Sequence, residues 1–371
     1  MRFYTGHTEM LTVQETIRVL VVDDSAFMRT AITRLLQADQ SIAVAGAARD
    51  GAEALRKIRE LNPDVVTMDI EMPGMNGIEA LRIIMRECPR PVLMISSLTQ
   101  EGAEATFEAL DSGAFDYIPK TLSYASLDIV QIQQDLIAKV HAAHQWTRRR
   151  QIATALPPPV HLAVSTLPRR CAFRAVCIGI STGGPKALQQ ILPLLPADFP
   201  VGILVVQHMP PGFTAPFARR LNSLCRMRVS EARAEDAIEP GRILIAPAGF
   251  QMIPYARASG AAVRISAMPN NTRHVPSVDV MMSGAASVFG PATMGVIMTG
   301  MGNDGEAGMR AIRAAGGYTL GQDERTCAVY GMPRACAEKN LLDRVVSLER
   351  IPAEVSAIAG YRSSAPIPLS S

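Results

Sequence analysis

The sequence predicts an α/β protein made of two doubly wound parallel-sheet domains. Short apolar runs alternate with segments of helical periodicity between residues 17 and 120, and the same alternation returns after residue 172. This alternation is typical of a parallel sheet covered by helices on both faces. At 371 residues, the chain is long enough for two domains that each bury a core.

The first predicted domain spans residues 17–122. Its predicted strands are Ile17–Val22, Ile42–Ala47, Val65–Met68, Val92–Ile95 and Tyr117–Ile118. Its predicted helices are Ser25–Ala38, Gly51–Leu61, Gly77–Glu87 and Glu101–Asp111. Each helical segment repeats apolar residues at three- and four-residue spacing, which is the period of a helix with one buried face.

The second predicted domain spans residues 172–355, and a short tail rich in Ala, Ser and Pro follows at 356–371. The predicted strands of this domain are Ala175–Ile180, Gly202–Gln207, Arg242–Ala246, Val263–Ser266 and Gly295–Thr299. Helical or irregular segments separate them, so this half also predicts an α/β fold.

Residues 123–171 form the predicted connector between the domains. In Ser126–Gln145, a single helical stripe carries Ile129, Ile132, Leu136 and Val140, and the cluster Arg148–Arg150 follows. The stripe favours a helix with one face packed on a domain over a nucleic-acid or partner surface. The prolines at 157–159 and 168 then predict a stiff, extended segment.

Composition and charge restrict the kinds of partner and compartment. Hydrophobic residues make up 48% and charged residues 19% of the chain, which is typical of a globular protein. A net charge of +3 does not indicate binding to nucleic acid or to a membrane surface. The first 16 residues lack the apolar core of a signal peptide, and no apolar run is long enough to span a bilayer. Six scattered cysteines without a C-x-x-C pair indicate reduced thiols, so we expect a cytoplasmic protein.

Acidic residues lie at the ends of two predicted strands of the first domain. Asp23 and Asp24 close the first strand, and Asp69 closes the third. Ligands of doubly wound sheets bind at these carboxyl ends, and clustered carboxylates favour Mg²⁺. Ser96 and Lys120 end the fourth and fifth strands, so a hydroxyl and an ammonium can meet a phosphoryl group on Asp69. One such residue could be a simple helix cap, but five such residues at four strand ends favour a phosphoryl-accepting site.

These residues resemble the receiver domain of two-component response regulators. The resemblance rests on V-V-D-D-S at Val21–Ser25, on M-D-I-E-M-P-G-M-N-G at Met68–Gly77, and on Ser96 and Lys120. It implies a flavodoxin-like fold, Asp69 as phospho-acceptor, Asp23 and Asp24 as metal-binding acids, and a histidine kinase as phosphate donor. Two departures are small: Asn76 stands where such domains often have Asp, and Thr121 rather than Pro follows Lys120.

The second domain opens with a candidate nucleophile, Ser181. The segment Gly179-Ile180-Ser181-Thr182-Gly183 directly follows an apolar strand and matches the G-x-S-x-G turn that exposes a catalytic serine. A Gly-rich turn of this kind can instead bind phosphate, so the motif needs a base and an acid to support it.

His208 and Asp304 are the favoured partners of Ser181. His208 immediately follows the strand Gly202–Gln207, whereas His274 lies in a loop without a strand to anchor it. Asp304 follows the strand Gly295–Thr299, and Asp198, Asp236 and Asp279 have weaker contexts. Because all three groups lie at carboxyl ends of strands, the sequence predicts a Rossmann-like serine hydrolase. Glycines near Thr182 and Met301 let backbone N–H groups approach an oxyanion.

Two alternative interpretations concern the same motifs. Gly300-x-Gly302-x-x-Gly305 also satisfies a dinucleotide fingerprint, and Asp323 stands at a suitable distance for a ribose contact. That interpretation leaves Ser181 and His208 without a role. An ordinary α/β-hydrolase would have the order Ser, acid, His, whereas the order here is Ser, His, Asp.

The second domain resembles the catalytic domain of the CheB family, the chemotaxis protein-glutamate methylesterases. The motifs are G-I-S-T-G-G-P at 179–185, Q-H-M-P at 207–210, V-P-S-V-D-V at 275–280, T-G-M-G-N-D-G at 299–305 and G-M-P at 331–333. The resemblance places the family's triad on Ser181, His208 and Asp304, and its oxyanion donors near Thr182 and Met301. It implies hydrolysis of γ-glutamyl methyl esters on chemoreceptors, and many members also deamidate receptor glutamines.

From the resemblance and the architecture we expect Mg²⁺ for phosphorylation of the receiver and no cofactor for the esterase step. The unphosphorylated receiver is expected to hinder access to the esterase cleft. A DNA-binding response regulator is disfavoured because the second half lacks a small helical reader and a concentrated basic face. A scaffold with an inactive esterase fold is disfavoured because all three triad positions are filled.

Overall fold

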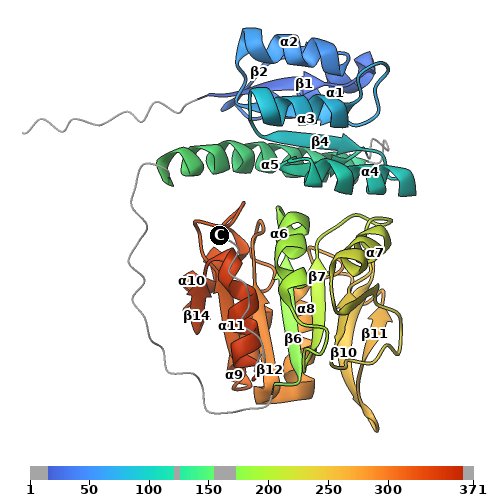
Figure 1. Cartoon of the computed structure of the whole chain (residues 1–371), viewed down its shortest axis with the longest axis vertical. Coiled ribbons are helices and arrows are strands. Elements are labelled where there is room, and N and C mark those ends of the chain that lie inside the picture. Colours follow the sequence, from blue (N-terminus) through green and yellow to red (C-terminus); the bar gives the residue numbers. More distant parts are fainter. Residues whose placement is uncertain (1–15, 121–125, 154–172, 362–371) are drawn as a thin grey trace, which may run out of the picture.

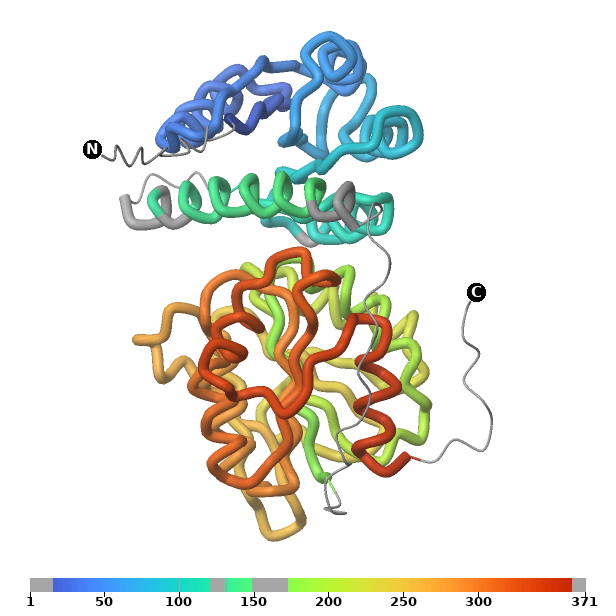
Figure 2. Tube along the Cα trace, turned by 90° about the vertical axis from the view of Figure 1, so that its left-hand side faces the viewer, coloured from blue at the N-terminus to red at the C-terminus, as the bar shows by residue number. Residues whose placement is uncertain are grey.

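The chain forms two α/β lobes with helices α4 (Gln100–Asp111) and α5 (Ser126–Ala153) lying between them (Figures 1 and 2). This computed structural model describes residues 16–120, 126–153 and 173–361. The predicted proline-rich connector and the last ten residues of the tail lie outside the described residues. Within the described residues, no helix has the length and apolar character needed to cross a membrane.

The first lobe contains a parallel sheet with strand order β2-β1-β3-β4-β5. Its strands are β1 Ile17–Val22, β2 Ile42–Ala48, β3 Val65–Asp69, β4 Val92–Ser96 and β5 Asp116–Pro119. Helices α1 Ala26–Leu36, α2 Gly51–Leu61 and α3 Gly77–Glu87 connect them together with α4. The flavodoxin-like fold that the resemblance implies is confirmed, and the reversal of strand order between β1 and β3 opens a crevice at their carboxyl ends.

Helix α5 belongs to this first lobe. Leu136, Val140 and Ala143 are buried in one apolar cluster with residues of β1, β4 and α1. The predicted connector helix is therefore present, but its apolar stripe completes the cover of one sheet face beside α1. A division at residue 122 separates α5 from the sheet that it covers.

The second lobe contains a parallel sheet with strand order β14-β13-β12-β6-β7-β9-β8. Its strands are β6 Ala175–Ile180, β7 Gly202–Gln207, β8 Arg228–Glu231, β9 Arg242–Ile245, β12 Thr293–Ile297, β13 Tyr318–Gln322 and β14 Arg344–Val346. Its helices and 3₁₀ turns are α6 Gly184–Ile191, η1 Leu192–Leu194, α7 Thr214–Leu224, α8 Val278–Phe289, η2 Gly290–Ala292, α9 Glu306–Ala314, α10 Met332–Glu338, η3 Leu348–Arg350 and α11 Ile351–Ile358. The chain leaves β6 toward β7 and later returns to β12 on the other side, so the switch point lies at β6.

Two predicted elements of the second lobe differ from the structure. The expected strand Val263–Ser266 is part of β11 (Gly260–Ser266), which pairs with β10 (Gln251–Arg257) in an antiparallel hairpin outside the main sheet. Residues 356–358, expected to start the tail, belong to α11 (Ile351–Ile358), which packs into the core because Ile351, Val355 and Ile358 recur at helical spacing and are buried. The expected boundary at 355/356 falls inside this helix.

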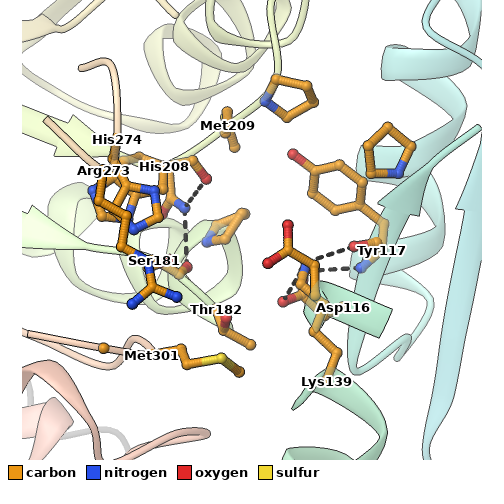
Figure 3. A pocket seen from close by; sticks show the side chains of 16 residues that line it. Asp116, Tyr117, Lys139, Ser181, Thr182, His208, Met209, Arg273, His274 and Met301 are labelled. Atoms are coloured by element: carbon orange, nitrogen blue, oxygen red, sulfur yellow. Dashed lines mark hydrogen bonds and ion pairs between the residues drawn. The ribbon is translucent and has the colours of Figure 1, made fainter. Parts of the chain in front are cut away.

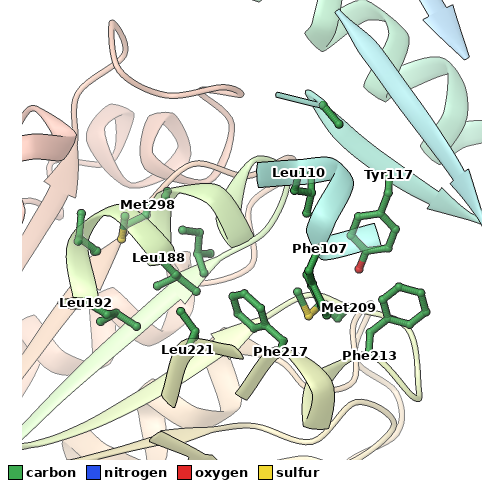
Figure 4. Close-up of a cluster of buried hydrophobic side chains, with 14 of the residues drawn as sticks. Phe107, Leu110, Tyr117, Leu188, Leu192, Met209, Phe213, Phe217, Leu221 and Met298 are labelled. Atoms are coloured by element: carbon green, nitrogen blue, oxygen red, sulfur yellow. The ribbon is translucent and has the colours of Figure 1, made fainter. Parts of the chain in front are cut away.

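A continuous apolar cluster joins the two lobes (Figure 4). Phe107 on α4 is 1% exposed and packs on Phe217 of α7, with ring centroids 5.3 Å apart. Tyr117 on β5 stacks on Phe213 at 5.2 Å. Ion pairs of Arg220 with Asp111 and of Arg219 with Glu104 also join the lobes. Burial of aromatic rings is the main stabilisation of this contact, since exposed ion pairs contribute little.

Candidate functional sites

The carboxylates of Asp23, Asp24 and Asp69 converge at the carboxyl end of the first sheet, with one oxygen of each within 4.8 Å of the others. Nζ of Lys120 lies 2.6 Å from Oδ2 of Asp69 and 3.3 Å from Oδ2 of Asp23. Burial raises the pKa of Asp69 to about 6 against the opposing effect of Lys120, and the charge of Asp23 adds to the rise. Among the described residues, Oδ2 of Asp23 is buried without a hydrogen bond. This excess of negative charge and the all-carboxylate donor set fit Mg²⁺.

Ser96 connects the same pocket to helix α4. Its side chain is fully buried, and its hydroxyl donates to the carbonyl oxygen of Gly102 at 3.0 Å. Oγ1 of Thr106 lies 2.6 Å away and donates to the Ser96 hydroxyl. In this structure the hydroxyl is therefore directed toward α4, the helix that contacts the second lobe.

Ser181 lies in the turn between β6 and α6, as the sequence predicts. Its backbone N–H donates to the carbonyl of Thr299 at 2.9 Å, which ties the end of β6 to the neighbouring segment after β12. The buried amide of Gln207 donates to the carbonyls of Ser181 and His208 at 2.9 and 3.0 Å. One side chain thus holds the segments that carry the candidate nucleophile and the candidate base.

His208 and Asp304 are joined by a hydrogen bond of 2.8 Å between Nε2 and Oδ2. The Asp304 carboxylate also accepts bonds from the backbone N–H groups of Val278 and Asp279 and from the hydroxyl of Ser277, at 2.9–3.0 Å. Burial alone would raise the pKa of Asp304, but His208 and these N–H groups lower it to about 2. The carboxylate is therefore ionised at neutral pH.

Of the expected arrangement of Ser181, His208 and Asp304, the contact between His208 and Ser181 is not formed as a hydrogen bond among the described residues. Nδ1 of His208 is buried and has no hydrogen-bond partner within residues 16–120, 126–153 and 173–361. The row of three side chains that the sequence predicts is therefore complete between His208 and Asp304, whereas no hydrogen bond between described residues links His208 to Ser181. Catalytic hydrogen bonds are often loose before substrate binds.

His274, the second histidine considered as a base, stacks on His208 with ring centroids 4.0 Å apart and an interplanar angle of 19°. Burial, with the charge of His208, lowers the pKa of His274 to about 4. A neutral His274 therefore supports one face of the His208 ring. The sequence placed His274 in a loop without a strand to anchor it and did not predict this stacking.

The backbone near Thr182 and Met301 can face an oxyanion. In the described part of the chain, the N–H groups of Thr182 and Met301 donate to no other protein atom. The loop carrying Met301 approaches Ser181 closely at Gly300, where a Cβ atom would lie 2.8 Å from Cβ of Ser181. Only glycine permits that approach.

A cavity of about 260 Å³ contains Ser181, Thr182, His208, His274 and Met301 (Figure 3). Its opposite wall comes from the first lobe and consists of Asp116, Tyr117, Pro119, Asp135 and Lys139. Oδ2 of Asp116 lies 3.4 Å from the backbone nitrogen of Gly183 and 3.2 Å from Nζ of Lys139. The sequence had no signal for this wall, because it arises only from packing of one lobe on the other.

The groups required for dinucleotide binding have other partners. Oδ1 of Asp279 accepts the N–H groups of Gly305 and Gly308 at 2.9 and 2.7 Å, which satisfies the start of α9. Oδ1 of Asp323 accepts the N–H of Thr326 at 3.0 Å. The helix terminus that would hold a pyrophosphate is thus occupied by a carboxylate of the chain itself.

Known proteins resemble this chain along most of its length. A protein-glutamate methylesterase/protein-glutamine glutaminase of Pyrococcus horikoshii is 45% identical over 343 residues, which cover 91% of this chain and 92% of that protein. One of Oleidesulfovibrio alaskensis is 45% identical over 359 residues, covering 90% and 96%. The crystal structure of the Thermotoga maritima CheB methylesterase catalytic domain aligns at 36% identity and a TM-score of 0.49, covering 52% of this chain and all of that domain.

The fold and the two sites define the class as a response regulator whose output domain carries a serine, a histidine and an aspartate at one sheet edge. The pattern of the response regulator receiver domain matches residues 19–130, and that of the CheB methylesterase matches residues 176–355. With relatives of 45% identity along nine-tenths of its length, the chain belongs to the CheB methylesterase family.

Proposed function

We propose that the chain is a phosphorylation-regulated protein-glutamate methylesterase that hydrolyses γ-glutamyl methyl esters on chemoreceptors. The relatives that cover about nine-tenths of the chain are named protein-glutamate methylesterase. The observation that supports it most strongly is the His208–Asp304 hydrogen bond in the cavity that also contains Ser181. A serine next to a carboxylate-oriented imidazole is the arrangement for acyl transfer.

In the proposed reaction, His208 accepts the proton of the Ser181 hydroxyl as Ser181 attacks the ester carbonyl. A carboxylate only accepts hydrogen bonds, so Asp304 requires the proton of neutral His208 on Nε2. Nδ1, which has no protein partner among the described residues, is then the basic nitrogen. Asp304 stabilises the imidazolium that forms.

The N–H groups of Thr182 and Met301 are proposed to bind the oxyanion of the tetrahedral intermediate, an interaction of about 3 kcal/mol per donor. His208 next protonates the methoxy oxygen, and methanol leaves an acyl-enzyme on Ser181. Water, deprotonated by His208, attacks this ester and releases the glutamate carboxylate and the free serine. The proposed steps use Ser181, His208 and Asp304, the two backbone N–H groups and water.

A second activity, deamidation of receptor glutamines, uses the same steps with ammonia as the leaving group. The names of the full-length relatives include protein-glutamine glutaminase. His208 would protonate the amide nitrogen instead of the methoxy oxygen, and the acyl-enzyme would be identical. We propose this activity alongside the methylesterase.

Asp69 is the proposed phospho-acceptor, and a sensor histidine kinase is the proposed donor in the cytoplasm. Asp23, Asp24 and Asp69 would hold Mg²⁺, which supplies positive charge to the phosphoryl oxygens when bound. Lys120, at 2.6 Å from Asp69, would neutralise a further oxygen. A Ser96 hydroxyl that turns toward the phosphoryl group would leave its partners Gly102 and Thr106 on α4.

The proposed regulation follows from the position of the first lobe over the serine cavity. Asp116 and Lys139 form part of the wall opposite Ser181, so a helical receptor substrate cannot approach the serine while the lobes stay docked. Thr106, which donates to Ser96, directly precedes Phe107 of the interface. Phosphorylation would shift the population toward an undocked arrangement.

Purified protein and its Ser181→Ala variant can test the activity on methyl-labelled receptor, with and without a small phosphodonor and Mg²⁺. Wild type should release labelled methanol faster with the phosphodonor, and Ser181→Ala should lose at least about 1000-fold in rate. Ammonia release from receptor glutamines reports deamidation in the same assay. Asp69 of the variant should still accept a phosphoryl group from the phosphodonor, which controls for folding of the first lobe. A wild-type rate of methanol release in this variant would refute the mechanism.

A further inference from the structure

Helices α8 and α9 cap each other through two aspartates. Asp304, which lies two residues before the first residue of α9, accepts the N–H groups of Val278 and Asp279 in the first turn of α8 at 2.9 and 3.0 Å. Asp279, in that first turn of α8, accepts the N–H groups of Gly305 and Gly308 at the start of α9 at 2.9 and 2.7 Å. Each carboxylate thus satisfies donors that the other helix leaves open.

The start of α9 depends on this arrangement. Its N-cap, Gly305, has a φ of 105° and no side chain that could accept a bond from the first turn. Asp279 supplies that acceptor from another helix, and its negative charge lies at the positive end of the α9 dipole. Because Gly305 directly follows Asp304, a bond to Gly305 also restrains the backbone of Asp304.

From this geometry we infer that Asp279 is a positioning residue for the hydrolytic reaction, acting through Gly305 on Asp304 and so on His208. The inference rests on the proposed methylesterase function. Asp279 does not line the serine cavity, so its side chain would act through its bonds to Gly305 and Gly308, at the end of the loop between Thr299 and Gly305. That loop carries both Met301, a proposed oxyanion donor, and Asp304.

The expected signature is a loss in kcat with little change in KM. Loss of the Asp279 carboxylate frees the loop, and a misplacement of about 1 Å in a catalytic group can cost about 100-fold in rate. We expect Asp279→Ala to lose about 100-fold in kcat. Asp279→Asn keeps an acceptor oxygen for Gly305 and Gly308, so it should stay within about fivefold of wild type.

Asp343→Ala is a matched control in the same domain. Asp343 accepts the backbone N–H and the hydroxyl of Thr319 at 2.9 Å each and pairs with Arg313. Thr319 lies near the amino end of β13, whereas the serine cavity lies at the carboxyl ends of the strands. This variant loses a comparable carboxylate anchor, but its contact with α9 is at Arg313 in the last turn, at the opposite end of the helix from Asp304. Its kcat should therefore stay within about twofold of wild type while its Tm falls.

The test measures kcat and KM for methanol release, Tm, and amide hydrogen exchange at Gly305 and Gly308 in full-length variants. Faster exchange at both glycines and a kcat loss in Asp279→Ala, together with rescue by Asp279→Asn, would support the inference. A kcat within threefold of wild type in Asp279→Ala, or an equal loss in Asp343→Ala, would overturn it. No methanol release by wild type would instead defeat the proposed function, and unchanged exchange in Asp279→Ala would still overturn the capping role.

Discussion

At the scale of single residues, Asp304 connects the candidate base to the start of a helix. It accepts bonds from Nε2 of His208 and from the N–H groups of Val278 and Asp279. A buried carboxylate with these partners is stabilised in its charged form, which is the form that can orient an imidazole. Reaction geometry and fold stability therefore depend on the same side chain.

The pH dependence of stability should reveal the charge on Asp304. Its pKa falls from an ordinary 3.8 to about 2 in the folded protein, so the ionised carboxylate stabilises the fold. That stabilisation, about 2 kcal/mol, is present above about pH 4 and is lost as the pH falls through about 2. In Asp304→Asn the amide does not titrate, so this part of the pH dependence should disappear.

Calorimetric unfolding of wild type and Asp304→Asn at a series of pH values measures the effect. The stability gap between the two proteins should be widest at neutral pH and should narrow by about 2 kcal/mol between pH 4 and pH 2. A gap that stays constant over this range would show that the carboxylate is not stabilised in the folded state. Circular dichroism at each pH controls for loss of fold.

At the scale of helices and strands, the start of α3 is packed directly on the end of β3. A Cβ atom at Gly77 would lie 1.9 Å from the carbonyl oxygen of Asp69. The N–H of Gly77 also donates to the carbonyl of Ile70 at 3.0 Å. Asp69, the proposed phospho-acceptor, is thus held by a contact that excludes any side chain at position 77.

Substitution of Gly77 by alanine should destabilise the first lobe by about 3 kcal/mol, because the backbone of Asp69 must move to relieve the clash. It should also slow phosphorylation by a small phosphodonor. Trp146, the only tryptophan in the sequence, packs on Phe115 of the first lobe, so its fluorescence can follow urea unfolding of that lobe.

Gly74→Ala separates steric clash from backbone strain. Gly74 has a φ of 76°, but a Cβ atom there would meet nothing within 4 Å. Alanine at this position should cost only about 1 kcal/mol, which is the strain of a left-handed backbone. Equal losses in the Gly77 and Gly74 variants would contradict the packing argument.

At the scale of the whole molecule, one apolar cluster holds the first lobe over the serine cavity. Phe107 of the first lobe packs between Phe213 and Phe217 of the second, with ring centroids 6.3 and 5.3 Å away. The Asp116 and Tyr117 wall of the cavity is adjacent, since Tyr117 stacks on the same Phe213. In the proposed regulation, access to Ser181 therefore depends on the stability of an aromatic contact between the lobes.

Replacing Phe107 by alanine should weaken docking of the lobes and raise methyl-ester hydrolysis in the absence of phosphodonor. Truncation of a buried phenylalanine costs about 3–5 kcal/mol, and 1.4 kcal/mol already changes a population tenfold. We expect at least a tenfold rise in the basal rate and a smaller stimulation by phosphodonor. Methanol release measures both quantities.

Leu224→Ala provides the control for this change. Leu224 ends α7, the helix that carries Phe217, but it is 42% exposed and outside the interlobe cluster. It should leave the basal rate and the stimulation unchanged. An unchanged basal rate in Phe107→Ala, with Asp69 still phosphorylated, would contradict inhibition by docking.

Local periodicity was sufficient to predict most of the strands and helices in both lobes. Gly51–Leu61, Gly77–Glu87 and Ala175–Ile180 have the bounds that their apolar spacing predicts. The short strands β8, β13 and β14 were not predicted, since polar residues interrupt or flank their few apolar residues. Only one strand of the β10–β11 hairpin was predicted, because the residue pattern of a single strand does not show which strand it pairs with.

The sequence by itself determined which groups lie at the carboxyl ends of parallel strands. That was enough to bring together Asp23, Asp24 and Asp69, and to place Ser181, His208 and Asp304 at one edge, because parallel strands end at a common edge. The stacking of His274, the hydrogen bonds of Asp279 to the start of α9 and the Asp116 wall were decided only by the tertiary structure. These contacts join segments that are far apart in the chain, and their geometry depends on how whole helices and lobes pack, which no local pattern specifies.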